Sequence, residues 1–273
     1  MPVEYHEQNR LSWNAATEQH HTHRPDLIEL YKNGKNNLYA EDMTLLGDLS
    51  GKTLLHLQCN DGQDSLSIAR FCHADVTGVD ISDTAIEFAK QFSSGAEIPA
   101  TFIRSDIFDY FETCETQFDV IYTSYGAVNW ISDIVCWGQG IAKLLKPGGK
   151  FVVVEFHPMA MMLDYDYALK WDYMQGEPDE SPGVGDYVGD DYEGAFKNPH
   201  KAFEFSWGTS EIITSLLSSG LQVTHFEEYP HVNGWQPFPE MRTEEKAGKI
   251  LHYPPDDKPI IAMMYSIVAI KPE

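Results

Sequence analysis

The sequence predicts an α/β protein with a mostly parallel sheet, and two observations between residues 54 and 157 support this fold class. Short apolar runs rich in Val, Ile and Leu alternate with amphipathic stretches, as expected when strands buried on both faces alternate with covering helices. Polar turns follow the runs, and acidic residues close two of them, at Asp80 and Asp106. This order indicates a sheet whose carboxyl ends hold a nucleotide-type cofactor.

The apolar runs predict five strands, near residues 53–58, 75–79, 100–104, 118–123 and 150–156. The amphipathic stretches predict helices near residues 25–32, 63–71, 83–92 and 133–145. Before the fifth strand, Pro147-Gly148-Gly149 predicts a helix stop and a tight turn. Further along the chain we expect a helix near 209–219, ended by Gly220, and strands near 222–229 and 260–270.

We expect residues 1–273 to form one domain, because 273 residues that are 42% hydrophobic suffice for one well-cored unit. Residues 1–50 are interpreted as an N-terminal cover and residues 51–157 as the cofactor-binding core. Residues 158–208 cluster Gly, Pro, Asp and Tyr, so we interpret them as an insertion or lid on the substrate side. Residues 209–273 are expected to complete the sheet.

Four motifs occur in the order of a known family: residues 56–62 (HLQCNDG), Asp80, residues 105–107 (SDI) and residues 145–151 (LKPGGKF). Together they resemble the class I S-adenosylmethionine-dependent methyltransferase family, and the resemblance covers about two thirds of the chain. It implies a Rossmann-like fold with a seven-stranded, mostly parallel sheet and an antiparallel last strand. It also implies S-adenosylmethionine as cofactor and S-adenosylhomocysteine as product.

Physical roles follow for several motif residues. Gly62 permits close approach of a ligand to the backbone, and Asp80 can accept hydrogen bonds from two ribose hydroxyls. The resemblance implies that Asp106 accepts a hydrogen bond from the adenine amino group and that Ile107 forms part of the wall of the adenine pocket. The full set of expected cofactor-binding residues is Gln58, Cys59, Asn60, Gly62, Asp80, Ile81, Ser105, Asp106, Ile107 and Ser124.

The first motif departs from the family pattern, because His56 replaces the usual acid and Gln58 and Asn60 replace two glycines. Asn tolerates the left-handed backbone region, so Asn60 can keep the turn. Gln58 could add an amide contact to the methionine part of the cofactor. The alternative, in which the loop has lost cofactor binding and Gln58 only caps the turn, is disfavoured by the presence of Asp80 and Asp106.

Methyl transfer from a sulfonium is an in-line displacement, so a protein mainly aligns the acceptor and excludes water. The segments after the fourth and fifth strands point to the same rim of the sheet, and they supply the candidate catalytic residues Tyr125 and His157. His157 could act as a base, since its pKa lies near operating pH. Equally, it could only cap the strand end before Pro158.

Charge and local sequence narrow the acceptor class. A net charge of −23 disfavours nucleic acid and anionic membranes, because phosphates would be repelled. Enzymes that methylate amino groups of bases or glutamine carry Asn/Asp-Pro-Pro-Tyr/Phe at the position of residues 124–127, which here read SYGA. The absence of that motif disfavours those substrates. We therefore expect a small-molecule substrate, neutral or cationic, with O, N, S or C as the acceptor atom. Five aromatic residues are expected either to line its pocket or to pack a lid: Trp13, Tyr187, Tyr192, Phe203 and Trp207.

Cysteines and histidines suggest no disulfide and no metal. The four cysteines, at positions 59, 72, 114 and 136, form no C-x-x-C pair, which is typical of free thiols in a reducing compartment. His20, His21 and His23 lack further ligands at metal-binding spacing and are interpreted as solvated. The longest apolar run, residues 260–270, is shorter than a membrane span. We expect a cytoplasmic protein; the sequence predicts no oligomeric state.

Two other functions stay open at this point. An NAD-dependent oxidoreductase would share the alternating strands and Asp80, but it would normally carry a second mononucleotide half where this chain has its two C-terminal strands. A non-catalytic S-adenosylmethionine-binding protein would share the whole cofactor site. Binding without turnover would separate this protein from an enzyme.

Overall fold

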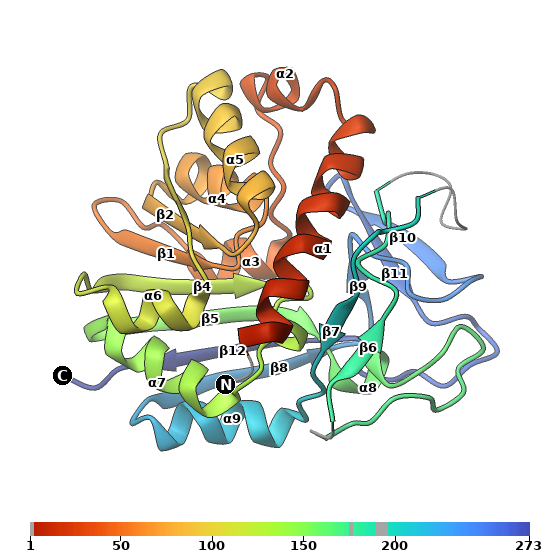
Figure 1. Ribbon diagram of the computed structural model, residues 1–273. Helices are drawn as coiled ribbons and strands as arrows, with labels where there is room; N and C mark the ends of the chain where they lie inside the picture. The colour runs from red at the N-terminus through yellow and green to blue at the C-terminus, as the bar shows by residue number, and fades with distance from the viewer. Residues whose placement is uncertain (1–2, 175–176, 189–195) are drawn as a thin grey trace.

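The computed structural model describes residues 3–174, 177–188 and 196–273, and its centre is a seven-stranded sheet (Figure 1). The strand order is β3-β2-β1-β4-β5-β12-β8. The strands are β1 (Thr53–Leu57), β2 (Asp75–Asp80), β3 (Thr101–Arg104), β4 (Phe118–Ser124), β5 (Leu145–Phe156), β8 (Gln222–Tyr229) and β12 (Met264–Ile270). Only β12 runs antiparallel to its neighbours, β5 and β8. The predicted fold class is confirmed.

Helices cover both faces of this sheet. One face carries α4 (Gln63–Ser67), a π-helical turn (Ile68–Cys72) and α5 (Asp83–Ala96). The other face carries α6 (Ile107–Thr113), α7 (Ile134–Leu144) and α9 (Thr209–Ser218). Side-chain caps start three of these helices: Ser82 accepts a hydrogen bond from the amide of Ala85, Asp106 from Phe108, and Asp133 from Val135.

The core follows from the apolar runs of the sequence. Each residue from Val152 to Val154 on β5 is fully buried, as expected for a strand covered on both sides. On one face Trp137 of α7 packs edge-on against Phe151, with ring centroids 5.3 Å apart. This rigid core fixes where the carboxyl ends of the strands lie, and therefore where a site can form.

Some predicted boundaries were wrong. β5 begins at Leu145, so residues 147–149 lie within the strand, where the pairing with β4 shifts between Phe118 and Val120. Gly148 there adopts a φ of 72°, which a bulge in a strand can absorb. Helix α6 was not predicted, because the Asp106 cap and one turn of apolar residues give a weak periodic signal.

The N-terminal segment forms three helices: α1 (Val3–Thr22), α2 (Leu27–Lys32) and α3 (Ala40–Leu46). In Figure 1 the long helix α1 crosses the carboxyl ends of the parallel strands. It packs against α5 on one side and against β7 (Ala202–Glu204) on the other. Helix α1 therefore lies between the sheet and the segments that follow β5.

In the described residues, those segments form two small sheets beside the strand ends (Figure 1). Strand β7 pairs with β6 (Asp179–Ser181), and β11 (Lys249–Tyr253) pairs with β9 (Val232–Asn233) and β10 (Arg242–Lys246). Helix α8 (Pro158–Met161) links β5 to this region, and a 3-10 turn at Val128–Trp130, between β4 and α7, contacts β7. None of these short strands was predicted; β10 is fully exposed and its sequence is RTEEK. Within the described ranges, no helix is long and apolar enough to cross a bilayer.

Candidate active site

A cavity of about 710 Å³, the main cavity, opens at the carboxyl ends of β1, β2 and β4. Its wall includes eight of the ten expected cofactor-binding residues: Gln58, Cys59, Asn60, Asp80, Ile81, Asp106, Ile107 and Ser124. The sheet brings these residues together because parallel strands end at one edge. Such a volume is typical of a site for a small ligand or cofactor.

The two remaining residues of that set, Gly62 and Ser105, are not part of the wall. Gly62 has a φ of 81°, and a Cβ there would lie 2.7 Å from the ring of Phe102. The expectation that Gly62 admits a ligand is therefore corrected, because its missing side chain makes room for Phe102. The Ser105 hydroxyl donates to the carbonyl of Asp106 at 2.8 Å.

The turn after β1 keeps a tight shape without the usual glycines. Gln58 and Asn60 both adopt positive φ, 55° and 48°. The Asn60 amide donates to Oδ2 of Asp80 at 2.8 Å, which ties the turn to β2. Nε2 of Gln58 donates to the carbonyl of Ala127 at 2.8 Å, whereas its buried Oε1 has no hydrogen-bond partner in the described residues. This oxygen is free to accept a hydrogen bond from a ligand in the main cavity.

Asp80 closes β2 at the wall of the main cavity. Its Oδ1 accepts from the amide of Ser82 at 2.8 Å, and its Oδ2 accepts from Asn60. Burial raises the pKa of Asp80 to about 6, against the lowering effect of these backbone hydrogen bonds. A carboxylate can accept about four hydrogen bonds, so each oxygen can still receive one more.

Asp106 is held by α1 as well as by its own helix. Its Oδ1 caps α6, and its Oδ2 lies 2.5 Å from Nδ1 of His6. The other ring nitrogen of His6 lies 2.6 Å from the hydroxyl of Ser132, and the ring stacks on Phe108 at 5.5 Å. A single histidine in a polar N-terminal segment gives no sequence signal for this contact, and His6 was not predicted.

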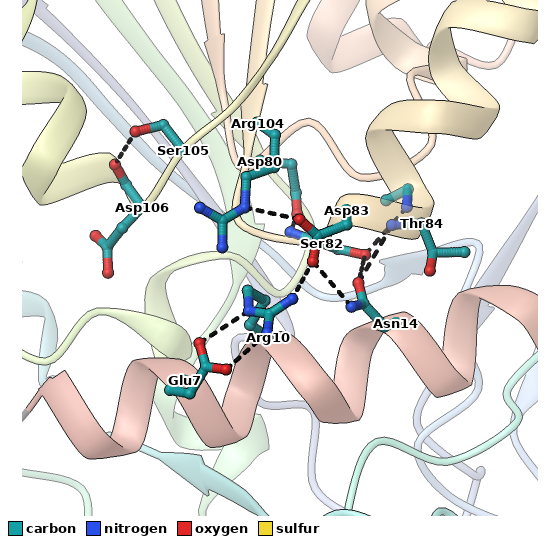
Figure 2. Close-up of polar contacts among 11 residues, drawn as sticks. Glu7, Arg10, Asn14, Asp80, Ser82, Asp83, Thr84, Arg104, Ser105 and Asp106 are labelled. Carbon is teal, nitrogen blue, oxygen red and sulfur yellow. Dashed lines mark hydrogen bonds and ion pairs between the residues drawn. The ribbon is translucent and has the colours of Figure 1, made fainter.

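Further polar contacts fasten α1 to the ends of β2 and β3 (Figure 2). Arg10 forms ion pairs with Asp83 and with Glu7, and Arg104 reaches the same Asp83 at 3.1 Å. Asn14 accepts from the hydroxyl of Ser82 at 2.7 Å. Glu7, Arg10 and Asn14 lie on one face of α1, so their contacts fix the helix over the main cavity.

His20 and His21 lie at the end of α1 and His23 follows it; the interpretation as solvated histidines was wrong for His20, which is buried, whereas His23 is exposed. His20 is buried, and its Nε2 lies 3.0 Å from the carbonyl of Gly185. The ring of His21 stacks on Phe88 at 3.6 Å, with Nε2 3.3 Å from Asp61. His23 lies 2.8 Å from Asp186. They diverge to different partners, and the described part of the chain contains no group of ligands that could hold a metal.

Tyr125 lines the main cavity as predicted, and its hydroxyl is engaged. It donates to Oδ2 of the fully buried Asp42 at 2.7 Å and accepts from Asn233 at 3.2 Å. Burial, and next the charge of Asp64, raises the pKa of Asp42 to about 7. Tyr125 adopts a φ of 48°, so a strained turn aims this residue at the cavity.

Glu155 holds that turn in place and was not predicted. Its carboxylate accepts four backbone hydrogen bonds, from Gly126, Ala127, Val128 and Phe156. The side chain is buried, and burial raises its pKa while the four amides lower it. Glu155 is therefore a positioning residue for the segment that follows β4.

His157 lies outside the described wall of the main cavity, which corrects its expected place at the rim. The ring is buried; Nδ1 accepts from the amide of Met159 at 3.0 Å and so caps α8. Nε2 lies 2.9 Å from Glu228 on β8. The cap before Pro158, which was the alternative interpretation, is what the geometry shows.

A second cavity of about 340 Å³ adjoins the main one. Asn129, Phe156 and Glu204 line both, so the two cavities meet at these side chains. Of the five expected aromatic residues, Trp13 and Tyr187 line the main cavity and Trp207 the second. Phe203 lines neither and packs on Tyr5 at 4.6 Å, whereas Tyr192 lies outside the described residues.

Comparison with known sequences identifies the central segment. A methyltransferase domain model matches residues 48–179. The 2-phytyl-1,4-naphtoquinone methyltransferase of Nostoc punctiforme is 34% identical over 113 residues, which cover 40% of this chain and 48% of that protein. The ubiquinone biosynthesis O-methyltransferase of Proteus mirabilis is 33% identical over 101 residues, 37% of this chain and 40% of that protein. The chain thus spans about half the length of these curated relatives, or less.

Solved structures agree on the fold over most of the chain. An S-adenosylmethionine-dependent methyltransferase from Mesorhizobium loti superposes with a TM-score of 0.51 at 18% identity, covering 88% of this chain and 100% of that one. The glycopeptide N-methyltransferase MtfA complexed with sinefungin gives 0.54 at 14% identity and 85% coverage of both chains. At such identities these likenesses concern the fold alone. The domain match shows that residues 48–179 belong to a methyltransferase domain, and the strand order and these likenesses show that this domain has the fold of class I S-adenosylmethionine-dependent methyltransferases.

Proposed function

We propose that this protein transfers the methyl group of S-adenosylmethionine to a small-molecule acceptor. The observation that carries the proposal is the main cavity at the carboxyl ends of a methyltransferase sheet. Its wall brings together Asp80, Asp106 and the turn of residues 58–60 after β1, the Gln58 turn. In this proposal residues 51–157 bind the cofactor, while residues 1–50 and 158–208 cover the site within one domain.

The residues present fit this cofactor. Asp80 would hold the ribose hydroxyls with its remaining lone pairs, and Ile81 and Ile107 offer apolar walls to an adenine ring. Asp106 would accept from the adenine amino group beside His6. The unpartnered Oε1 of Gln58 would accept from the ammonium group of the methionine part.

Charge favours a cationic cofactor over a dinucleotide. The described wall of the main cavity contains five carboxylates, Asp61, Asp64, Asp80, Asp106 and Glu204. Its strongly basic side chain is Arg24, which would face the single carboxylate of S-adenosylmethionine. A diphosphate would meet five like charges there, and this disfavours an NAD-dependent oxidoreductase.

The bound cofactor would supply a methyl group on a positively charged sulfur. The protein then has to align an acceptor and exclude water. Helix α1 covers the cavity through His6, Arg10 and Asn14, which limits solvent access. Tyr125, held by Asp42, is the candidate catalytic residue that faces the cavity; the geometry gives no support to His157 in that role.

The acceptor class and place of action are part of the proposal. The two curated relatives bear the names of a naphthoquinone methyltransferase and a ubiquinone biosynthesis O-methyltransferase, so small acceptors are the class we favour here. A net charge of −23 argues against nucleic acid as partner. All four cysteines are free, which is in keeping with the cytoplasm.

Calorimetric titration with S-adenosylmethionine, S-adenosylhomocysteine and NAD tests this proposal. We expect micromolar binding of the two sulfur cofactors and none of NAD. Asp80→Ala should weaken binding by on the order of 100-fold, because charge-assisted hydrogen bonds contribute about 1.5–3 kcal/mol each. Asp75→Ala is the matched control, since Asp75 is exposed at the opposite end of β2.

Absence of binding at millimolar S-adenosylmethionine would overturn the proposal and would mean that the Gln58 turn no longer serves a cofactor. Equal loss in the Asp75 and Asp80 variants would show that the effect comes from the fold. Binding without transfer of a labelled methyl group to any class of small acceptor would identify a non-catalytic S-adenosylmethionine-binding protein.

A further inference from the structure

We propose that the second cavity is the acceptor site and that it binds an organic cation, a protonated amine. The inference rests on the proposed methyl transfer and names its substrate class. Its geometric basis is the shared wall of Asn129, Phe156 and Glu204, because an acceptor seated in the second cavity would face the main cavity there.

The first argument is charge. Six carboxylates line the second cavity, and its described wall has no Lys, Arg or His. Three of the six are already compensated: Glu155 by backbone amides, Asp164 by Lys170 at 2.8 Å, and Glu180 by Lys201 at 2.5 Å. The other three, Asp172, Asp179 and Glu204, form no ion pair with a described basic side chain.

These three carboxylates affect one another. Burial, and next the charge of Asp172, raises the pKa of Asp179. Burial also raises the pKa of Glu204; the hydrogen bond from Asn129 opposes this rise and the charge of Asp179 adds to it. Asp172 and Asp179 lie at the exposed mouth, whereas Glu204 is half-buried at the junction. This arrangement would attract a cation at the mouth and hold it beside Glu204.

The second argument is the aromatic wall. Trp171, Trp207, Trp235, Phe156 and Tyr265 line the same cavity. The rings of Phe156 and Trp235 lie 4.6 Å apart at 48°. Aromatic faces attract ammonium groups, and Nζ of Lys170 already lies 4.4 Å from the centre of the Trp171 ring. Such walls bind an organic cation better than a neutral molecule of the same shape.

The third argument is two buried oxygen atoms that have no hydrogen-bond partner in the described residues. They are the hydroxyl of Tyr265, whose side chain is fully buried, and Oδ1 of Asn129. Nδ2 of Asn129 donates to Oε2 of Glu204 at 2.8 Å, which leaves its Oδ1 as an acceptor. An unpaired buried polar atom is costly, and the N–H groups of an amine would supply the missing donors.

The chemistry balances with the groups present. A protonated amine first gives a proton to the carboxylate of Glu204, which leaves a lone pair on nitrogen. That nitrogen forms the new N–C bond with the methyl group, the S–C bond breaks, and its electron pair stays on sulfur. The products are an N-methylated ammonium ion, S-adenosylhomocysteine and a protonated Glu204, which returns its proton to solvent.

The test compares a cation with a neutral molecule of nearly equal shape. Quenching of tryptophan fluorescence is titrated with 2-phenylethylamine, protonated at pH 7, and with 2-phenylethanol. We expect the amine to bind at least tenfold more tightly. Glu204→Gln combined with Asp179→Asn should remove this preference, whereas Glu177→Gln, an exposed carboxylate of the same segment outside both walls, should retain it.

Equal affinity for the two probes, or no detectable binding of either, would overturn the proposal. A preference that survives in the double variant would overturn the roles of Glu204 and Asp179. The affinity for S-adenosylhomocysteine is measured on the same samples. No binding of S-adenosylhomocysteine refutes the proposed function. Binding of S-adenosylhomocysteine together with equal affinities for the two probes refutes the amine site alone. Circular dichroism confirms that the double variant is folded.

Discussion

The main cavity and the second cavity lie side by side but are built in different ways. The main cavity takes most of its sheet-side wall from strand ends and the turns after them, such as Asp80 and the Gln58 turn. The second cavity takes much of its wall from residues 158–207, with only short strands and turns between them. A rigid edge that serves one constant ligand thus lies next to a wall that can change without disturbing the sheet.

The largest effect should come from the residue that both cavities depend on. Glu155→Ala removes the acceptor for four backbone amides at the junction. We expect the free energy of unfolding to fall by about 3 kcal/mol or more, because each buried donor left unpaired costs roughly 1–3 kcal/mol. Urea denaturation followed by tryptophan fluorescence measures the change.

Glu245→Ala is the control, since this side chain is exposed on β10; its effect should stay within about 0.5 kcal/mol. A loss below 1 kcal/mol in Glu155→Ala would mean that water replaces the carboxylate easily. The two cavities would then not share a rigid joint.

The next largest effect should be confined to ligand binding in the main cavity. Asp80 has a pKa of about 6, and its charged form is the better acceptor for ribose hydroxyls. As pH falls through 6 the carboxyl gains a proton, so affinity for S-adenosylmethionine should fall, by on the order of tenfold at pH 5 relative to pH 7.5. Calorimetric titrations across this range give the profile.

Asp80→Asn should bind weakly at all pH values and lose this part of the pH dependence. If the profile of the variant parallels that of the wild type, another group controls it.

A smaller effect is expected from a substitution in helix α1, which covers the main cavity. His6→Phe retains a ring to stack on Phe108 but removes the contacts with Asp106 and Ser132. We expect a loss of about 1 kcal/mol in stability, the net contribution of a typical hydrogen bond. Faster hydrogen exchange of the α1 amides, with the sheet unchanged, would locate the effect; uniform acceleration would contradict a local role.

The smallest effect should come from the ion pairs of Figure 2. Arg10 and Asp83 lie near the surface, so Arg10→Ala should cost less than about 1 kcal/mol. The difference from wild type should shrink as salt rises from 0.05 to 1 M, because screening weakens exposed pairs. A loss that does not depend on salt would indicate packing by the Arg10 side chain instead.

The same contrast explains how much could be predicted. Strand positions and most helix positions follow from the apolar runs, and the eight wall residues of the main cavity follow from the motifs at the ends of those runs, as for Asp80. The arrangement of the strands in a seven-stranded sheet with an antiparallel last strand was implied by the family resemblance. His6, Glu155 and, apart from Trp207, the wall of the second cavity could not be predicted, because their contacts join distant segments without a periodic pattern. His157 illustrates the limit of such predictions. The sequence indicates that a strand ends before Pro158, but contacts with α8 and Glu228 set the direction of the His157 ring.

Helix α1 also has a consequence for how the protein is made. Asn9 exchanges hydrogen bonds with the backbone of Phe203, 194 positions later in the chain. A ribosome adds about 5–20 residues per second, so the first helix emerges well before its partner strand exists. Contacts of such long range also carry a large loop-closure cost and form slowly. The covered pocket is therefore completed late in synthesis, and until then the first helix must avoid other partners.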